Sequence, residues 1–283
     1  MASIILDKRI FLYGTSFFGW IGMGASMLLL GCALSPVERI EQDVRDYGFT
    51  RQVVFGDGFS HVIYRNNGSS RSGPLHVYLE GDGSPWLQGR FIATDPTPRN
   101  PVMLHLMALD STPSVYLGRP CYHGLMDQAS CVPQYWTHGR YSMRVVLSMA
   151  AVLRRAFASG QYTGLMFFGH SGGGTLAMLL AERFPQTQVV VTLAGNLDPD
   201  AWTQYHDYSP LRSSLNPSRR TSLDPAIYQL HLVGGRDENI PPRLSHAAVA
   251  RQKKAEIRII NNFNHGCCWH KLWSTVLQML TDR

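Results

Sequence analysis

The apolar residues of this chain form two kinds of run, which predict two kinds of secondary structure. Short uninterrupted runs are typical of strands buried on both faces, whereas apolar residues three or four positions apart predict helices. The expected strands cover 49–55, 61–64, 75–79, 114–117, 165–168, 188–193, 227–233 and 257–260, and the expected helices cover 37–47, 102–109, 142–158, 176–181, 243–255 and 269–280. The first two strands are separated by Gly56-Asp57-Gly58, a hairpin signal. The alternation that follows predicts an α/β fold, with a mostly parallel central sheet of about eight strands and helices on both faces.

One turn between an expected strand and an expected helix carries a candidate nucleophile. Gly169-His170-Ser171-Gly172-Gly173 matches Gly-x-Ser-x-Gly, the nucleophile elbow, in which a tight strand-to-helix turn holds a serine in a strained conformation. The glycines are needed because neighbouring backbone passes close to the turn. The N–H groups at the start of the next helix can stabilise an oxyanion. We therefore interpret Ser171 as a catalytic nucleophile; the alternative is a glycine-rich turn that only packs.

A serine nucleophile needs a base to take its proton and a third group to hold that base. In an open α/β sheet these groups lie just past the C-terminal ends of strands. Asp237 follows the strand expected at 227–233, and His265 follows the strand expected at 257–260. The order Ser171, Asp237, His265 is the order that the elbow motif predicts.

From about Phe49 to the C-terminus the chain resembles an α/β-hydrolase. The resemblance rests on the elbow, on a Gly-x-x-Asp-x-x-x-Pro turn around Asp237, and on a late histidine, His265, before the last helix. It implies an α/β-hydrolase fold with Ser171 as nucleophile and His265 as general base and then general acid. Asp237 would orient the imidazole.

Three other residues compete for the base and acid roles. His270 is also late in the sequence, but the apolar residues around it place it within the last helix. Glu238 neighbours Asp237 but lies farther from the strand end. Asp198 follows the strand expected at 188–193, a position where some hydrolases of this kind carry the acid, and it remains the alternative acid.

The resemblance also implies an oxyanion hole made of two backbone N–H groups. One is expected from Gly172, which follows the nucleophile. The other comes from a turn after an early strand that usually begins His-Gly, and here this turn reads Glu80-Gly81-Asp82-Gly83. Asp82 or Gly83 would donate the second N–H. A tight turn with a solvated Asp82 is the alternative, because Glu80 is an unexpected neighbour for an oxyanion.

The N-terminal segment reads as an export signal rather than as part of the folded domain. Lys8 and Arg9 precede an uncharged apolar stretch, 10–30, which ends at Leu29-Leu30-Gly31-Cys32. This ending resembles a bacterial lipobox, so we expect a signal peptide at 1–31, lipidation of Cys32, and a tether with a short peripheral helix at 32–48. An uncleaved membrane helix is the alternative. Alanine rather than aspartate after Cys32 favours the outer membrane, facing the periplasm.

The hydrolase domain is expected to span 49–283, with 197–226 forming a small cap beside the active site. Together with the loop at 121–140, the cap should supply aromatic pocket walls. Cys121 and Cys131 lie in that loop and are predicted to pair, because export implies an oxidising compartment. A disulfide between the neighbours Cys267 and Cys268 would be strained and uncommon. No Cys-x-x-Cys spacing supports a zinc site, and we expect neither metal nor cofactor.

The formal net charge is +6, but the basic residues are scattered rather than interleaved with aromatic residues. A nucleic-acid partner is therefore not expected. The sequence predicts an envelope-anchored serine hydrolase that cleaves a small-molecule or lipid ester, or a thioester or amide, through an acyl-enzyme. An acyltransferase with the same triad is one alternative, and a catalytically silent hydrolase-like binding lipoprotein is the other.

Overall fold

The structure is a computed structural model that describes residues 34–66, 73–160 and 162–282. The expected signal peptide and the expected lipidation site, Cys32, lie outside the described residues. In chain order the elements are α1 (Pro36–Asp46), β1 (Thr50–Phe55), β2 (Ser60–Arg65), β3 (Gly73–Leu79), β4 (Trp86–Leu87), β5 (Phe91–Ile92), α2 (Val102–Met107), β6 (Ser114–Leu117), η1 (Pro133–Trp136), α3 (Met143–Ala158), β7 (Tyr162–His170), α4 (Gly172–Ala181), β8 (Thr187–Leu193), α5 (Pro199–Tyr205), η2 (Pro217–Arg219), β9 (Tyr228–Gly234), α6 (Pro242–Val249), β10 (Glu256–Ile260) and α7 (His270–Thr281).

The eight strands predicted from the sequence form one sheet, in the order β1-β2-β6-β3-β7-β8-β9-β10. The opening hairpin, β1 and β2, is antiparallel, and β2 also pairs antiparallel with β6. Every other neighbouring pair is parallel. The predicted fold class is therefore confirmed. Because the parallel strands run in one direction, the turns that follow β3, β7, β9 and β10 all meet at one edge of the sheet.

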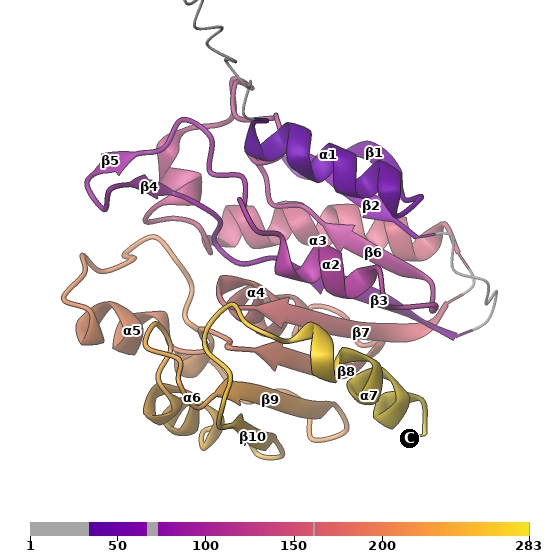
Figure 1. Cartoon of the computed structure of the whole chain (residues 1–283), viewed down its shortest axis with the longest axis vertical. Coiled ribbons are helices and arrows are strands. Elements are labelled where there is room, and N and C mark those ends of the chain that lie inside the picture. Colours follow the sequence, from indigo (N-terminus) through magenta and orange to yellow (C-terminus); the bar gives the residue numbers. More distant parts are fainter. Residues whose placement is uncertain (1–33, 67–72, 161, 283) are drawn as a thin grey trace, which may run out of the picture. The chain divides into compact units, whose positions relative to one another are not determined.

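Two hydrophobic clusters lie on the two faces of this sheet. On β3 the apolar side chains alternate: Leu75, Val77 and Leu79 enter one cluster, and Tyr78 enters the other. Residues of α3, α4 and α6 complete the first cluster, and residues of α1, α2 and α7 complete the second. Figure 1 shows α1, α2 and α7 on the near side of the sheet. Helices thus cover both faces, as the continuous apolar strands predicted.

Helix α1 differs from the peripheral helix that we expected in the tether at 32–48. Its residues Ile40 and Val44 are buried against the sheet, one turn apart on the same face. The hydroxyl of Tyr64 on β2 also donates to Glu41 at 2.9 Å. The expectation of a peripheral helix was wrong, because the narrow apolar stripe of this charged segment packs on the domain.

A few element boundaries also differ from the prediction. Helix α6 ends at Val249 instead of near residue 255, and α2 ends at Met107 instead of residue 109. Strands β4 and β5 form a short hairpin that was not expected from the sequence, and its turn residues Gln88 and Gly89 both have positive φ. Within the described part of the chain, no helix has the length and apolar character that crossing a membrane requires.

Candidate active site

The elbow expected at Ser171 is present between β7 and α4. Ser171 has φ 53° and ψ −123°, a conformation that non-glycine residues rarely adopt. Its N–H donates to the carbonyl of Leu193 at 3.0 Å, which ties the turn to β8. A β-carbon on Gly173 would overlap the carbonyl oxygen of Leu79, and one on Gly169 would overlap the backbone of Gly173. The glycines are therefore required by close backbone packing, which holds the serine in its strained conformation.

The structure brings Ser171, His265 and Asp237 together in hydrogen-bonding sequence. The Oγ of Ser171 lies 3.0 Å from Nε2 of His265, and Nδ1 of His265 lies 2.9 Å from Oδ2 of Asp237. The other oxygen of Asp237 accepts the backbone N–H groups of Asn239 and Ile240, at 2.9 and 2.8 Å. Since the buried carboxylate only accepts, Nδ1 carries the imidazole proton and Nε2 is free to accept from the serine.

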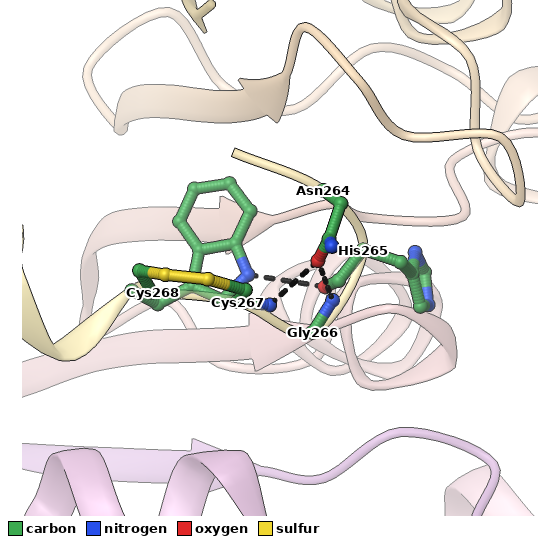
Figure 2. Close-up of a disulfide and its surroundings, with 6 residues drawn as sticks. Asn264, His265, Gly266, Cys267 and Cys268 are labelled. Atoms are coloured by element: carbon green, nitrogen blue, oxygen red, sulfur yellow. Dashed lines mark hydrogen bonds between the residues drawn. A yellow bond between two sulfur atoms is a disulfide. The ribbon is translucent and has the colours of Figure 1, made fainter. Parts of the chain in front are cut away.

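The backbone of His265 is fixed by neighbouring side chains. Its carbonyl oxygen accepts from Nε2 of His170, at 2.8 Å, and from the indole N–H of Trp269, at 3.1 Å. The side-chain oxygen of Asn264 accepts the N–H groups of the two residues that follow His265, as Figure 2 shows. These contacts hold the loop that carries the imidazole.

Two disulfides are present in the described residues. Cys121 pairs with Cys131, with Cα atoms 5.5 Å apart, in the loop where the sequence analysis placed it. Cys267 pairs with Cys268 directly beside the His265 loop, a bond between neighbours that we regarded as uncommon.

The three residues that competed for the acid and base roles do not contact Ser171 or His265 through an observed hydrogen bond. Asp198 caps α5, accepting from the N–H of Ala201 at 3.2 Å and from the amide of Asn216 at 2.7 Å. His270 is exposed at the first turn of α7. Asp237, rather than its neighbour Glu238, reaches the imidazole.

The turn at 80–83 lies against the elbow. A β-carbon on Gly81 would lie 3.4 Å from Cβ of Ser171, so this backbone is in contact with the nucleophile. Gly83 instead lies against the carbonyl oxygen of Pro96. Of the two residues expected to donate the second oxyanion N–H, Asp82 is the one that directly follows Gly81, whose backbone contacts the nucleophile. Gly172 opens α4, so its N–H belongs to the first turn, whose donors have no acceptor within the helix.

The Asp82 carboxylate is not solvated, in contrast to the alternative that the sequence left open. It lies 2.8 Å from Arg119, 2.7 Å from Arg140 and 2.7 Å from the hydroxyl of Tyr141, and both arginines are almost fully buried. Burial favours the neutral acid, but the two guanidinium groups outweigh it and hold the pKa of Asp82 at about 2. A β-carbon on Gly172 would overlap this carboxylate. An ionised cluster thus supports the backbone of the expected oxyanion hole.

Glu80, the unexpected acidic residue, has a structural role. Its two carboxylate oxygens accept the N–H of Gly81, at 3.0 Å, and the N–H of Met103 in α2, at 2.9 Å. The side chain therefore ties the turn to α2 and is only 6% exposed.

Ser171 and His265 open into a cavity of about 880 Å³. The expected cap contributes to its wall, and so do His138 and Arg140 of the loop at 121–140. The turn at 80–86 forms another side, including Trp86, which the sequence analysis did not single out. Aromatic and aliphatic lining residues are Trp86, Trp202, Tyr208, Leu211 and Ile240, and polar ones include Arg99, His138, Arg140 and Asn239.

A second serine–histidine pair lies elsewhere in the core. Nε2 of His61 is 2.7 Å from Oγ of Ser148, and Nδ1 of His61 is 2.9 Å from the carbonyl oxygen of Gly118. Both side chains are completely buried and neither lines the cavity. Among the described residues, no group of three His, Cys, Asp or Glu side chains could hold a metal ion.

No family model matches this chain, and no curated protein matches it. Several solved structures match this chain in fold. Est1E from Butyrivibrio proteoclasticus is 13% identical with a TM-score of 0.59, covering 81% of this chain and 98% of that one. A putative α/β hydrolase from Agrobacterium tumefaciens is 13% identical with a TM-score of 0.55, covering 82% and 95%. An esterase from Pyrococcus furiosus is 11% identical with a TM-score of 0.59, covering 84% and 92%.

This chain has the α/β-hydrolase fold. At such low identities the likeness shows the fold alone. Within this fold Ser171, His265 and Asp237 form one hydrogen-bonded series, and they follow one another in the chain in the order Ser171, Asp237, His265 that the elbow motif predicts.

Proposed function

We propose that this chain is a serine hydrolase that cleaves a carboxylic ester, or a thioester or amide, through an acyl-enzyme. The observation that carries the proposal is the hydrogen-bonded series Ser171–His265–Asp237 on the wall of an open cavity. Such a series activates a hydroxyl that is otherwise a weak nucleophile.

In the first half of the reaction, Oγ of Ser171 attacks the carbonyl carbon of the substrate while its proton passes to Nε2 of His265. The carbonyl electrons move to the oxygen, which the N–H groups of Gly172 and Asp82 stabilise. His265 then gives the proton to the leaving group as the bond to it breaks. Water repeats the sequence on the acyl-enzyme, releasing the acid and restoring Ser171.

Esters are the favoured substrate class because the cavity is partly apolar and because one of the proteins with a similar structure is described as an esterase. The aromatic walls from the cap favour an apolar acyl or aryl group over a charged one. No observation favours acyl transfer or a silent binding role over hydrolysis.

A fluorophosphonate probe tests the proposal on the full chain purified in detergent. We expect covalent labelling of Ser171, lost in Ser171→Ala and reduced at least about 1,000-fold in His265→Ala. Ser148→Ala is the matched control, because Ser148 also contacts a histidine but is buried away from the cavity. Labelling that persists in Ser171→Ala, or a folded wild type that is never labelled, would refute the triad.

We also propose that Cys32 carries a lipid and anchors the protein in the bacterial envelope, with the outer membrane favoured. The supporting observation is the charged start, apolar stretch and Leu-Leu-Gly-Cys ending of the N-terminal sequence. Mass spectrometry of the mature N-terminal peptide should show a diacylglyceryl-modified Cys32, and Cys32→Ser should abolish the modification. An unmodified N-terminus that still includes residues 1–31 would contradict this anchor.

A further inference from the structure

Asn239 connects three parts of the site. Its backbone N–H donates to Asp237 at 2.9 Å, and its carbonyl oxygen accepts from Nε2 of His206 at 2.8 Å. Its side-chain Nδ2 lies 3.0 Å from Nε2 of His265, and its Oδ1 lies 3.2 Å from the indole nitrogen of Trp202. One residue thus links the acid, the base and the cap helix α5.

The orientation of this amide follows from the chemistry of its partners. The indole N–H of Trp202 can only donate, so it must face the amide oxygen of Asn239. The amide NH₂ group is then directed at His265, where it competes with the hydroxyl of Ser171 for the one lone pair on Nε2. This contact exists only while Nε2 carries no proton.

The reaction requires the opposite state of His265. When Ser171 attacks, its proton moves to Nε2, and an N–H of Asn239 can no longer point at that atom. Turning the amide would present Oδ1 to the new Nε2–H and stabilise it. That turn places the NH₂ group against the indole N–H, so it requires Trp202 to move away.

We propose that Asn239 makes the reactivity of Ser171 depend on occupancy of the cap, so that esters whose acyl group reaches Trp202 react faster than esters of short acids. Trp202 lines the cavity and is only partly buried, so an apolar acyl chain can pack on its ring and displace the indole N–H. The amide then turns, and His265 accepts the serine proton. This specificity rests on the proposed hydrolase function.

The test compares kcat/KM for p-nitrophenyl acetate and p-nitrophenyl octanoate, which share a leaving group and differ only in the acyl chain. Trp202→Phe removes the indole N–H and keeps an aromatic ring, and Asn239→Ala removes the amide. We expect each variant to raise the rate on acetate by about three- to tenfold, the effect of one hydrogen bond, and to lower the octanoate-to-acetate ratio by at least that factor. The double variant should match Asn239→Ala, because Trp202 acts on His265 only through the amide of Asn239.

Tyr205→Phe is the control, since Tyr205 lies on the same helix outside the cavity lining and is expected to leave both rates unchanged. Thermal unfolding of each variant establishes that it is folded. A fall or no change in acetate hydrolysis in both single variants, or effects that multiply in the double variant, would overturn the inference while leaving the hydrolase proposal intact. Hydrolysis that survives in Ser171→Ala would instead refute the proposed function, and the inference with it.

Discussion

The ionised cluster around Asp82, in the turn at 80–83, predicts a large loss of stability for a nearly isosteric change, Asp82→Asn. The variant keeps the shape and loses the charge that two buried guanidinium groups, Arg119 and Arg140, share. Lowering the pKa of Asp82 from 3.8 to about 2 corresponds to about 2 kcal/mol of stability. Leaving buried charges without their partner costs about 3–5 kcal/mol in comparable cases. We therefore expect the free energy of unfolding to fall by about 2–5 kcal/mol.

Guanidinium unfolding of residues 34–283 at pH 7 measures this loss, and Asp200→Asn is the matched control. Asp200 contacts Arg219 at 2.6 Å, but the two side chains are 37% and 75% exposed, so its loss should cost less than about 1 kcal/mol. The pH dependence adds a second check. The pKa is lower in the folded state, so the contribution of Asp82 is complete above pH 4 and declines as the pH falls toward 2. The gap between wild type and Asp82→Asn should therefore narrow below pH 4. An Asp82→Asn variant as mildly affected as Asp200→Asn would refute the reasoning.

Two further outcomes follow from buried groups and close packing. Burial lowers the pKa of His61 and His231 to about 4 and that of His123 to about 3, so each is neutral in the folded state and takes up a proton on unfolding at pH 5. The contribution of these neutral histidines to the free energy of unfolding is therefore complete above pH 6.5. We expect urea unfolding to show a loss of about 2 kcal/mol per histidine between pH 6.5 and 5. A free energy of unfolding that does not change over this pH range would contradict the burial of these side chains. Gly173→Ala places a β-carbon on the backbone of β3 and should lower the free energy of unfolding by about 3 kcal/mol. It should also abolish most fluorophosphonate labelling. The control is Gly266→Ala, whose β-carbon meets open space and should leave the free energy of unfolding within about 0.5 kcal/mol of wild type.

The sequence was most informative where chemistry depends on neighbours along the chain. The elbow at Ser171 is a local motif, and the positions of Asp237 and His265 follow from the rule that functional groups lie after parallel strands. Periodicity located the eight strands for the same reason, since burial on both faces leaves continuous apolar runs.

The features that the sequence analysis missed depend on residues far apart in the chain. The ionisation of Asp82 depends on Arg119 and Arg140, which the fold brings to it from the two ends of the segment between β6 and α3. In the sequence Asn239 is an ordinary turn residue, and only the fold places Trp202 of α5 beside its side chain. In the sequence Glu80 is an acidic residue with no evident partner, and only the fold places the N–H of Met103 beside its carboxylate. None of these pairings leaves a signal in spacing or composition.

If Cys32 carries the proposed lipid, the packing of α1 limits where the proposed enzyme can work. Because α1 begins at Pro36 and is buried against the sheet, a chain of three residues, 33–35, would join the lipidated residue to this helix. Three extended residues span about 10 Å, roughly a third of the hydrocarbon thickness of a bilayer. A protein anchored at Cys32 would sample a thin layer at one membrane surface and meet esters held there at a high effective concentration. Inserting a flexible segment before Pro36 would widen that layer without changing the active site.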